Sequence, residues 1–224
     1  MHEPQDPAKN ERRLTYGLLL AAALVWLWSA YEPIDMHTWM IEQVATLIAA
    51  VIVLWLGRSV HFDSLSRVNF FLLFCIHTLG THYTYSLTPY PEFSELLFGS
   101  SPNDWFNWQR NHYDRFVHFA FGALMYHPIK QALAPRLRQQ KPPVHWLSGH
   151  IIVSVSALYE LLEWAAAIIF GGDMGIAYLG TQGDIWDAQI DIALGGLGWM
   201  VACLMHYGVI LCRVVAASNQ RPLE

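Results

Sequence analysis

Residues 39–57 read WMIEQVATLIAAVIVLWLG and contain a single charged side chain, that of Glu42. A helix needs about 20 largely apolar residues to cross the hydrocarbon core of a bilayer, and this stretch has that length and character. Five further stretches are of the same kind, so the sequence predicts an all-α, polytopic transmembrane helical bundle with six spans. The predicted spans are residues 14–31, 39–57, 68–87, 113–134, 146–170 and 185–214.

The composition agrees with a membrane protein and excludes several other classes. Hydrophobic residues make up 54% of the chain and charged residues 14%, whereas about a quarter of the residues of a soluble domain are charged. A net charge of -5 without a basic patch argues against a nucleic-acid partner. Cys75, Cys203 and Cys212 lie in apolar segments without CxxC spacing, so we expect no disulfide framework.

The distribution of Lys and Arg predicts the orientation of the bundle. If the six spans alternate in direction, only Arg110 and Arg115 of the 13 basic residues fall on one side of the membrane. The other eleven are Lys9, Arg12, Arg13, Arg58, Arg67, Lys130, Arg136, Arg138, Lys141, Arg213 and Arg221. Because basic residues concentrate in cytoplasmic segments, we expect a cytoplasmic tail over residues 1–13, a membrane domain over 14–215 and a cytoplasmic tail over 216–224. The run that begins at residue 14 is too long for a signal peptide and is interpreted as a retained first span.

The longest outer loop, residues 88–111, is rich in aromatic side chains. Such residues are typical of the membrane–water interface, so an interfacial anchor is the simplest interpretation, and a lid over a substrate is the alternative. The aromatic residues are Phe93, Phe98, Trp105, Phe106 and Trp108.

Ionisable side chains inside the predicted spans gather in the outer half of the membrane. Asp114 and His118 are i, i+4 neighbours on one helix face, and Glu160 and Glu163 fall in the outer half of their span. Such groups are costly in a bilayer and usually face the interior of a bundle. A second stripe, along the last span, consists of Asp184, Asp187, Asp191, Gly195 and Gly198.

The glycines of that stripe predict the close approach of another helix below the carboxylates. In the third span, His77 and His82 lie about 140° apart around a regular helix, and depth favours His82 for the cluster. Whether His77 and Glu42 join it stays open at this point.

Several carboxylates cannot all remain ionised near one another in a low-dielectric setting, so protonation or a bound cation is needed. A mixed His, Asp and Glu set suits zinc, manganese or iron, although no HExxH motif is present. The predicted metal ligands are His82, Asp114, His118, Asp184, Asp187 and Asp191. Glu160 or Glu163 is the predicted catalytic base, and Arg115 is predicted to bind an anionic headgroup or phosphate.

Three functions are compatible with this cluster. The first is a metal-dependent enzyme that acts on a lipid or a lipid-linked envelope molecule. The second is a non-catalytic protein whose ion pairs hold polar helices together, and the third is a small ion or solute transporter. Membrane lipids are partners in each case, and the oligomeric state is not predicted.

Four segments carry a resemblance to a known family. HTLGTHYTY (residues 77–85), YDRFVHFAFG (113–122), YELLEW (159–164) and GTQGDIWDAQID (180–191) resemble the YjdF-like bacterial inner membrane proteins. That resemblance implies a small multi-pass protein of the bacterial inner membrane and implies no reaction. The pairs Asp114–His118 and Asp187–Asp191 are also similar to the VanZ-like membrane proteins, a family associated with the cell envelope. Intramembrane zinc hydrolases of the ceramidase type are an analogy only.

Overall fold

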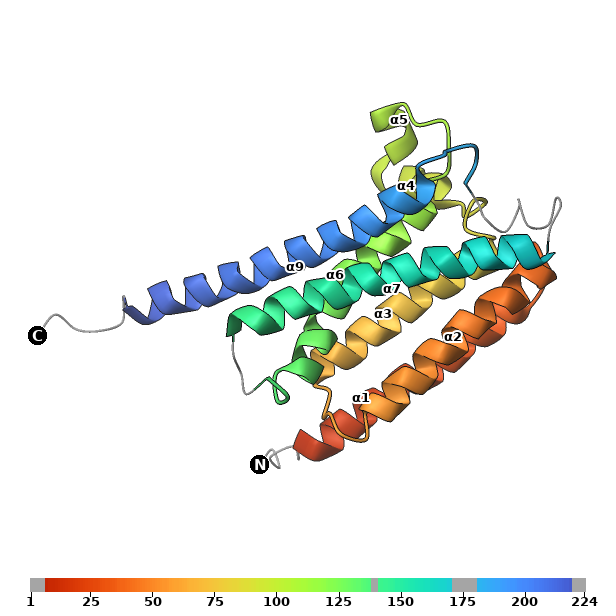
Figure 1. Ribbon diagram of the computed structural model, residues 1–224. Helices are drawn as coiled ribbons and strands as arrows, with labels where there is room; N and C mark the ends of the chain where they lie inside the picture. The colour runs from red at the N-terminus through yellow and green to blue at the C-terminus, as the bar shows by residue number, and fades with distance from the viewer. Residues whose placement is uncertain (1–6, 138–140, 171–180, 219–224) are drawn as a thin grey trace, which may run out of the picture.

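The computed structural model describes residues 7–137, 141–170 and 181–218, which form helices and, within these ranges, no strand (Figure 1). The helices are α1 (Pro7–Ala30), α2 (Met36–Leu56), α3 (Ser64–His82), α4 (Tyr90–Phe98), α5 (Pro102–Phe106), α6 (Tyr113–Leu133), α7 (Lys141–Phe170) and α9 (Asp187–Ser218). The predicted all-α class is therefore confirmed. The outer parts of both predicted tails, most of the loop after α7, Arg138 and Arg221 lie outside the described residues.

Local sequence signals define where the long helices begin. Asp35 is the N-cap of α2 and accepts a hydrogen bond of 2.9 Å from the backbone N–H of His37. Asp63 caps α3 in the same way, at 2.8 Å from the N–H of Ser66. A side-chain acceptor at this position satisfies one of the free N–H groups of the first turn, so each helix starts directly after an aspartate.

The six long helices run alternately in opposite directions (Figure 1). As a result, α1 begins and α9 ends at the same end of the bundle. α6 packs against α3, α7 and α9, and its pairing with α9 is the most extensive in the described part of the chain. α6 is therefore the central helix, and it carries the first two residues of the candidate site.

Two glycine contacts set the separation of α6 and α9. A Cβ added to Gly122 would collide with the backbone oxygen of Gly195, and one added to Gly198 would collide with the backbone oxygen of Phe119. Only a residue without a side chain fits at such a crossing. The predicted close approach of a helix at Gly195 and Gly198 is thus confirmed, and the approaching helix is α6.

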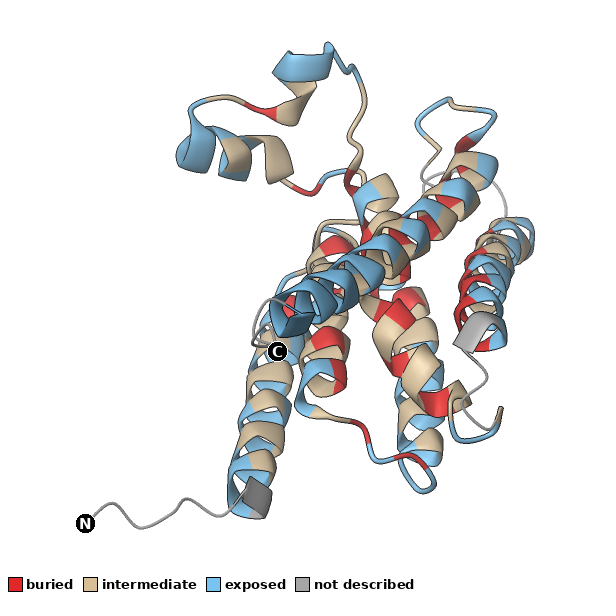
Figure 2. Ribbon diagram, turned by 90° about the vertical axis from the view of Figure 1, so that its left-hand side faces the viewer, coloured by how far each residue is buried: buried red, intermediate tan, exposed pale blue. Residues whose placement is uncertain are grey.

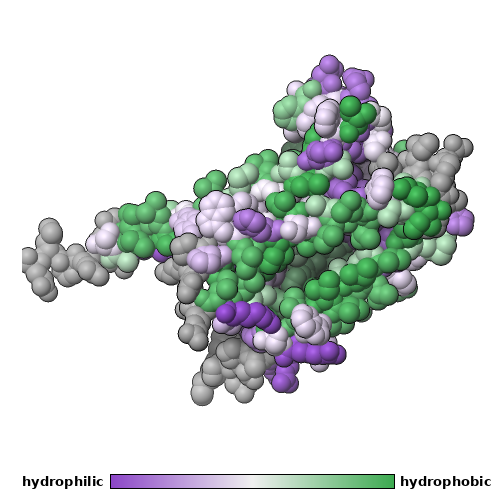
Figure 3. Space-filling model, viewed as in Figure 1, coloured by the Kyte–Doolittle hydropathy of each residue, from purple (hydrophilic) through white to green (hydrophobic). Residues whose placement is uncertain are grey.

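Apolar side chains cover the outside of the bundle. The buried residues gather where the long helices face one another, and the outward faces are exposed (Figure 2). Hydrophobic residues cover much of the face in Figure 3, and a hollow on this face separates α7 from α2. An apolar surface this extensive is typical of contact with lipid.

Among the described residues, four helical segments are long and apolar enough to cross a membrane: Lys9–Ala30, Met36–Leu56, Pro143–Ile169 and Asp187–Ser218. α3 and α6 are of similar length but hold more polar residues, including the buried Asn69 of α3 and the buried His118 of α6. These two helices lie next to each other inside the bundle. The other helices shield them, so they do not need a uniformly apolar surface.

The predicted outer loop, residues 88–111, contains two short helices, α4 and α5, that were not expected from the sequence. α4 and α5 form an arm that stands away from the bundle (Figure 2). Ser101 and Asp104 form a capping box at the start of α5, and the Tyr90 hydroxyl donates to Oδ1 of Asn103 at 2.5 Å. The exposed side chains of this arm include Phe93, Leu96, Leu97, Phe98, Trp105 and Phe106.

Candidate metal centre

Three potential ligands converge between α6 and α9. One ligand atom each from Asp114, His118 and Asp191 lies within 4.8 Å of the other two. His118 and Asp191 are buried, with 6% and 1% of their surface exposed. Zinc takes nitrogen and carboxylate oxygen ligands at about 2.0–2.2 Å, so three such atoms this close together could share one ion. We refer to these three residues as the Asp–His–Asp cluster.

The helical spacing of the sequence places the cluster where α6 and α9 meet. Asp114 and His118 are one turn apart on α6, and the His118 Nε2 atom lies 3.8 Å from Oδ1 of Asp114. Asp187, Asp191, Gly195 and Gly198 are the buried residues of α9 and form its inner face. Because the glycines let the backbones approach, Asp191 is held directly against the α6 pair.

α7 supplies a third acidic group. The Oε1 atom of Glu160 lies 3.1 Å from Nε2 of His118. Two buried oxygens near this point, Oδ1 of Asp191 and Oγ of Ser156, have no hydrogen-bond partner among the described residues. Buried polar atoms are almost always satisfied in folded proteins, so these oxygens indicate a missing partner such as a cation or water.

Glu163 lies on the same inner side of α7. It is buried, with 8% of its surface exposed, and it interacts electrostatically with Asp114, Glu160, Glu42 and Asp191. The predicted base candidates Glu160 and Glu163 therefore both border the cluster, and Glu160 is the one whose carboxylate contacts His118.

Two predicted ligands, Asp184 and Asp187, are engaged by arginines. Nη1 of Arg110 lies 2.7 Å from Oδ1 of Asp187, and Nη2 of Arg115 lies 2.5 Å from Oδ2 of Asp184. Arg110 also lies 3.5 Å from Asp184, and Arg115 lies 3.4 Å from Asp187. Asp184 precedes α9, so it extends the acidic stripe beyond the helix. We call these four residues the Arg–Asp layer; it lies one turn from Asp191.

The charges of the Arg–Asp layer perturb two groups outside the spans. The backbone N–H of Trp186 and the guanidinium of Arg115 lower the pKa of Asp184. Burial, together with the positive charges of Arg115 and Arg110, lowers the pKa of His112. The Nδ1 atom of a neutral His112 accepts from Nη1 of Arg115, at 3.2 Å. Both shifts favour a layer with two charged ion pairs and an uncharged imidazole.

The sequence predicted His82 as a ligand and left His77 open, and in the structure neither histidine belongs to the Asp–His–Asp cluster. Nδ1 of His82 lies 3.1 Å from the backbone oxygen of Ser29, and its ring stacks on Trp28 with centroids 4.4 Å apart. His82 is thus packed against α1 and lies apart from the Asp–His–Asp cluster. His77 faces inward instead, because α3 stays helical through Gly80 and keeps the two rings on different faces.

A second polar group, the Glu42–His77 network, adjoins the cluster. The hydroxyl of Tyr159 donates to Glu42 at 2.9 Å, and the Tyr159 ring lies 5.8 Å from that of His118. His77 contacts the hydroxyls of Thr46 and Tyr85 at 2.8 and 2.5 Å. Glu42 and His77 are therefore neighbours of the site and are not within ligand distance of the cluster.

Three residues of this region were absent from the predicted site. Arg110 carried a usable signal, because it and Arg115 are the only basic residues expected on the outer side. Tyr159 precedes Glu160 directly, but tyrosine is common at helix ends near the interface. Ser156 is one turn before Glu160 and gives no signal of its own, since serine inside a span is ordinary.

An all-helical bundle with an apolar exterior and a buried polar centre is a multi-pass integral membrane protein. The chain belongs to the DUF2238 family of predicted membrane proteins, whose model matches residues 14–211. It is 29% identical over 180 residues to the inner membrane protein YjdF of Escherichia coli (strain K12), which covers 80% of this chain and 82% of YjdF. No solved structure matches it. The predicted family and the inner-membrane location are thereby confirmed.

Proposed function

We propose that the chain crosses the inner membrane six times, with both ends in the cytoplasm. The alternating directions of the six long helices support an even number of crossings. The uneven distribution of Lys and Arg supports the orientation. On this topology the Asp–His–Asp cluster, at the start of α6 and of α9, lies toward the periplasmic face.

The cluster in this proposal binds one divalent transition metal ion: zinc, manganese or iron. The observation that carries it is the convergence of Asp114, His118 and Asp191 within 4.8 Å, with the unpartnered Oδ1 of Asp191 among them. A cation compensates the carboxylates, which would otherwise repel one another in a low-dielectric interior. A nitrogen and several oxygens suit these metals better than magnesium or calcium.

The function that these features support best is metal-dependent hydrolysis of a lipid or lipid-linked envelope substrate. A bound metal ion makes water acidic enough to act as a nucleophile near neutral pH. Glu160, in contact with His118, is placed to accept a proton from that water. Glu163 borders the same space and is the second candidate for this role.

The Arg–Asp layer is suited to orienting an anionic substrate beside the metal. Nη2 of Arg110 and Nε of Arg115 are buried and have no hydrogen-bond partner among the described residues. A guanidinium with a free N–H is a strong donor to phosphate or carboxylate oxygens. The hollow between α7 and α2 in Figure 3 supports lateral access of a lipid from the bilayer.

Metal content tests the proposal directly. Protein purified without chelator and resupplied with zinc, manganese and iron is expected to hold about one equivalent of metal. Asp191→Asn keeps the size of the side chain and is expected to lose most of that metal. Asp184→Asn is the matched control and is expected to retain it, because Asp184 pairs with Arg115.

Three other outcomes would change this proposal. Absence of metal from the wild type after resupply would leave the ion-pair network as the better account of the buried charges. Bound metal with uptake into vesicles but unchanged lipids would favour the transporter over the hydrolase. Equal metal loss in Asp191→Asn and Asp184→Asn would contradict the assignment of ligands.

A further inference from the structure

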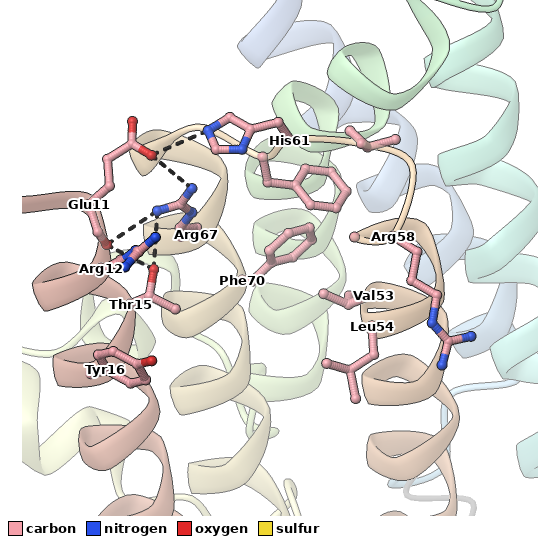
Figure 4. Close-up of a pocket in the computed structure, with 13 residues that line it drawn as sticks. Glu11, Arg12, Thr15, Tyr16, Val53, Leu54, Arg58, His61, Arg67 and Phe70 are labelled. Carbon is pink, nitrogen blue, oxygen red and sulfur yellow. Dashed lines mark hydrogen bonds and ion pairs between the residues drawn. The ribbon is translucent and has the colours of Figure 1, made fainter. Parts of the chain in front are cut away.

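A groove opens between the helices at the end of the bundle where α1 begins and α2 ends. It has a volume of about 660 Å³, which is within the range of small-molecule sites. α1 and α2 form its two walls, and the start of α3 with the loop before it forms its base (Figure 4). It is lined by Glu11, Arg12, Thr15, Tyr16, Val53, Leu54, Gly57, Arg58, Val60, His61, Phe62, Arg67 and Phe70.

The base of the groove is apolar and firmly packed. Val60 and Phe62 are buried and form a cluster with Ala132 of α6, against which Phe70 also packs. The rings of Phe62 and Phe70 meet edge to face, with centroids 5.1 Å apart. Val53 and Leu54 continue this apolar surface along α2, toward the middle of the bundle (Figure 4).

Of the three arginines in the groove, Arg67 already has partners within the protein. Nη1 of Arg67 donates to Oγ1 of Thr15 at 3.1 Å, and its Nη2 lies 3.2 Å from Oε2 of Glu11. The same carboxylate oxygen lies 3.2 Å from Nε2 of His61. Arg67 and Glu11 therefore largely neutralise each other and fasten α1 to α3.

The other two arginines are available to a ligand. Arg12, on α1, and Arg58, just after α2, are exposed on opposite walls. Neither side chain has an ion-pair or hydrogen-bond partner in the part of the chain that the structure describes. The groove thus combines an excess of positive charge at its rim with an apolar surface that runs along the helices.

We propose that this groove binds an anionic phospholipid of the inner membrane, with its phosphodiester at the rim and an acyl chain over the apolar surface. The rim supplies the charge complementary to the phosphate, and the apolar wall accounts for the lipid tail. A soluble anion would contact the arginines but not the apolar Val53 and Leu54. The two features together therefore favour a lipid. On the proposed topology the headgroup lies at the cytoplasmic leaflet, among the basic residues of that side.

The groove is independent of the metal centre. Ala132, under its base, is 18 residues along α6 from Asp114, which at 1.5 Å per residue is about 27 Å. No residue is shared between the two sites. A result that contradicts one site therefore does not contradict the other. In the groove variants, an unchanged metal content would indicate that the fold is intact.

Lipid retention in nanodiscs tests the proposal. The full-length protein is reconstituted in equal parts of phosphatidylglycerol and phosphatidylcholine, and the retained lipids are counted by native mass spectrometry. We expect phosphatidylglycerol to be retained in preference, and Arg12→Gln and Arg58→Gln each to lower this retention about fivefold. Arg13→Gln is the matched control, because it removes the same charge from the neighbouring position, which does not line the groove.

Three results would overturn the lipid site. The first is an equal loss of phosphatidylglycerol in all three variants, which would indicate general surface charge. The second is equal retention of phosphatidylglycerol and phosphatidylcholine by the wild type. The third is displacement of the lipid by millimolar glycerol phosphate, which would indicate a site for a free phosphate ester. A cytoplasmic reporter fused after Glu224 verifies that each variant keeps the wild-type topology.

Discussion

Nε2 of His118 on α6 lies 3.1 Å from Oε1 of Glu160 on α7, closer than it lies to Asp114 one turn away on its own helix. The contact joins two helices of the bundle next to Asp191 of α9. One imidazole has at most two N–H donors, so it cannot donate a hydrogen bond to every carboxylate around it. The arrangement therefore leaves acidic oxygens without a donor, and it is these that a cation would satisfy.

Glu160→Gln separates proton transfer from metal binding. The amide keeps the size of the side chain but is a poor base, so metal content is expected to stay within about twofold of wild type. Any metal-dependent lipid turnover is expected to fall by about 10²–10⁴-fold. Elemental analysis and mass spectrometry of lipid extracts measure the two quantities on the same preparation.

Glu163→Gln is the matched comparison, because it makes the same change one turn away. If Glu160 is the base, this variant retains most of the turnover. The reverse order of the two variants would assign the role to Glu163, and unchanged turnover in both would remove a glutamate base from the proposal.

Gly122→Ala and Gly198→Ala are expected to destabilise the α6–α9 crossing. The added methyl meets backbone atoms that cannot rotate away, and overpacking of this kind costs about 1–3 kcal/mol. Unfolding temperature in detergent is the measurement. Gly208→Ala is the control, since nothing lies within 4 Å of its added Cβ, and it is expected to be neutral or slightly stabilising. Equal effects at Gly198 and Gly208 would contradict the close crossing.

The Arg–Asp layer predicts a loss of stability in acid. The folded structure lowers the pKa of Asp184, through the N–H of Trp186 first and Arg115 second. A depressed carboxyl pKa stabilises the fold above the unfolded value, about 3.9, and this contribution disappears as the pH falls through the folded value. The unfolding temperature of wild type is thus expected to exceed that of Asp184→Asn near neutral pH, with the difference closing in strong acid.

Glu92→Gln provides the control for that experiment, because Glu92 is exposed on α4 and has no ion pair within the described residues. Its curve is expected to follow wild type throughout. A difference between wild type and Asp184→Asn that persists unchanged in strong acid would show that the aspartate acts without its charge.

Asp63→Ala is expected to destabilise the start of α3 by about 1 kcal/mol, because it removes the N-cap bond to Ser66. The same substitution breaks the contact of 2.9 Å with Nε2 of His127. Asp63→Asn keeps a capping oxygen and loses only the charge, so it is expected to cost less than Asp63→Ala. Thermal unfolding of both variants decides whether the cap or the partly exposed ion pair contributes more.

Reporter fusions test the six-span topology. A reporter that is active only in the cytoplasm is expected to work after Glu224 and in the loop between α2 and α3. One that is active only in the periplasm is expected to work between α4 and α5. Periplasmic activity after Glu224 would contradict a cytoplasmic C-terminus. If the α2–α3 loop were periplasmic as well, the bundle would be inverted and the Asp–His–Asp cluster would lie toward the cytoplasmic face.

Much of the site could be predicted from sequence because helical periodicity fixes neighbours within one element. Spacing alone placed Asp114 with His118, and Asp187 with Asp191 and the two glycines. It could not place His82, because the direction in which a side chain points depends on how its helix is rotated in the bundle. In the structure that rotation turns His82 to Trp28 and His77 to Thr46.

The sequence by itself determined the all-helical class, the positions of the six long helices and the inner-membrane location. The class and the helix positions follow from a local quantity, the length of each apolar run, whereas the location followed from the family resemblance. Only the tertiary structure decided which acidic groups face His118 and which face an arginine. Asp184 and Asp191 are both acidic members of one stripe, yet Asp184 faces Arg115 while Asp191 faces His118. The physical reason is that such pairing depends on contacts between different helices, and the close approach at Gly122 and Gly195 fixes which residues of α6 each part of α9 can reach.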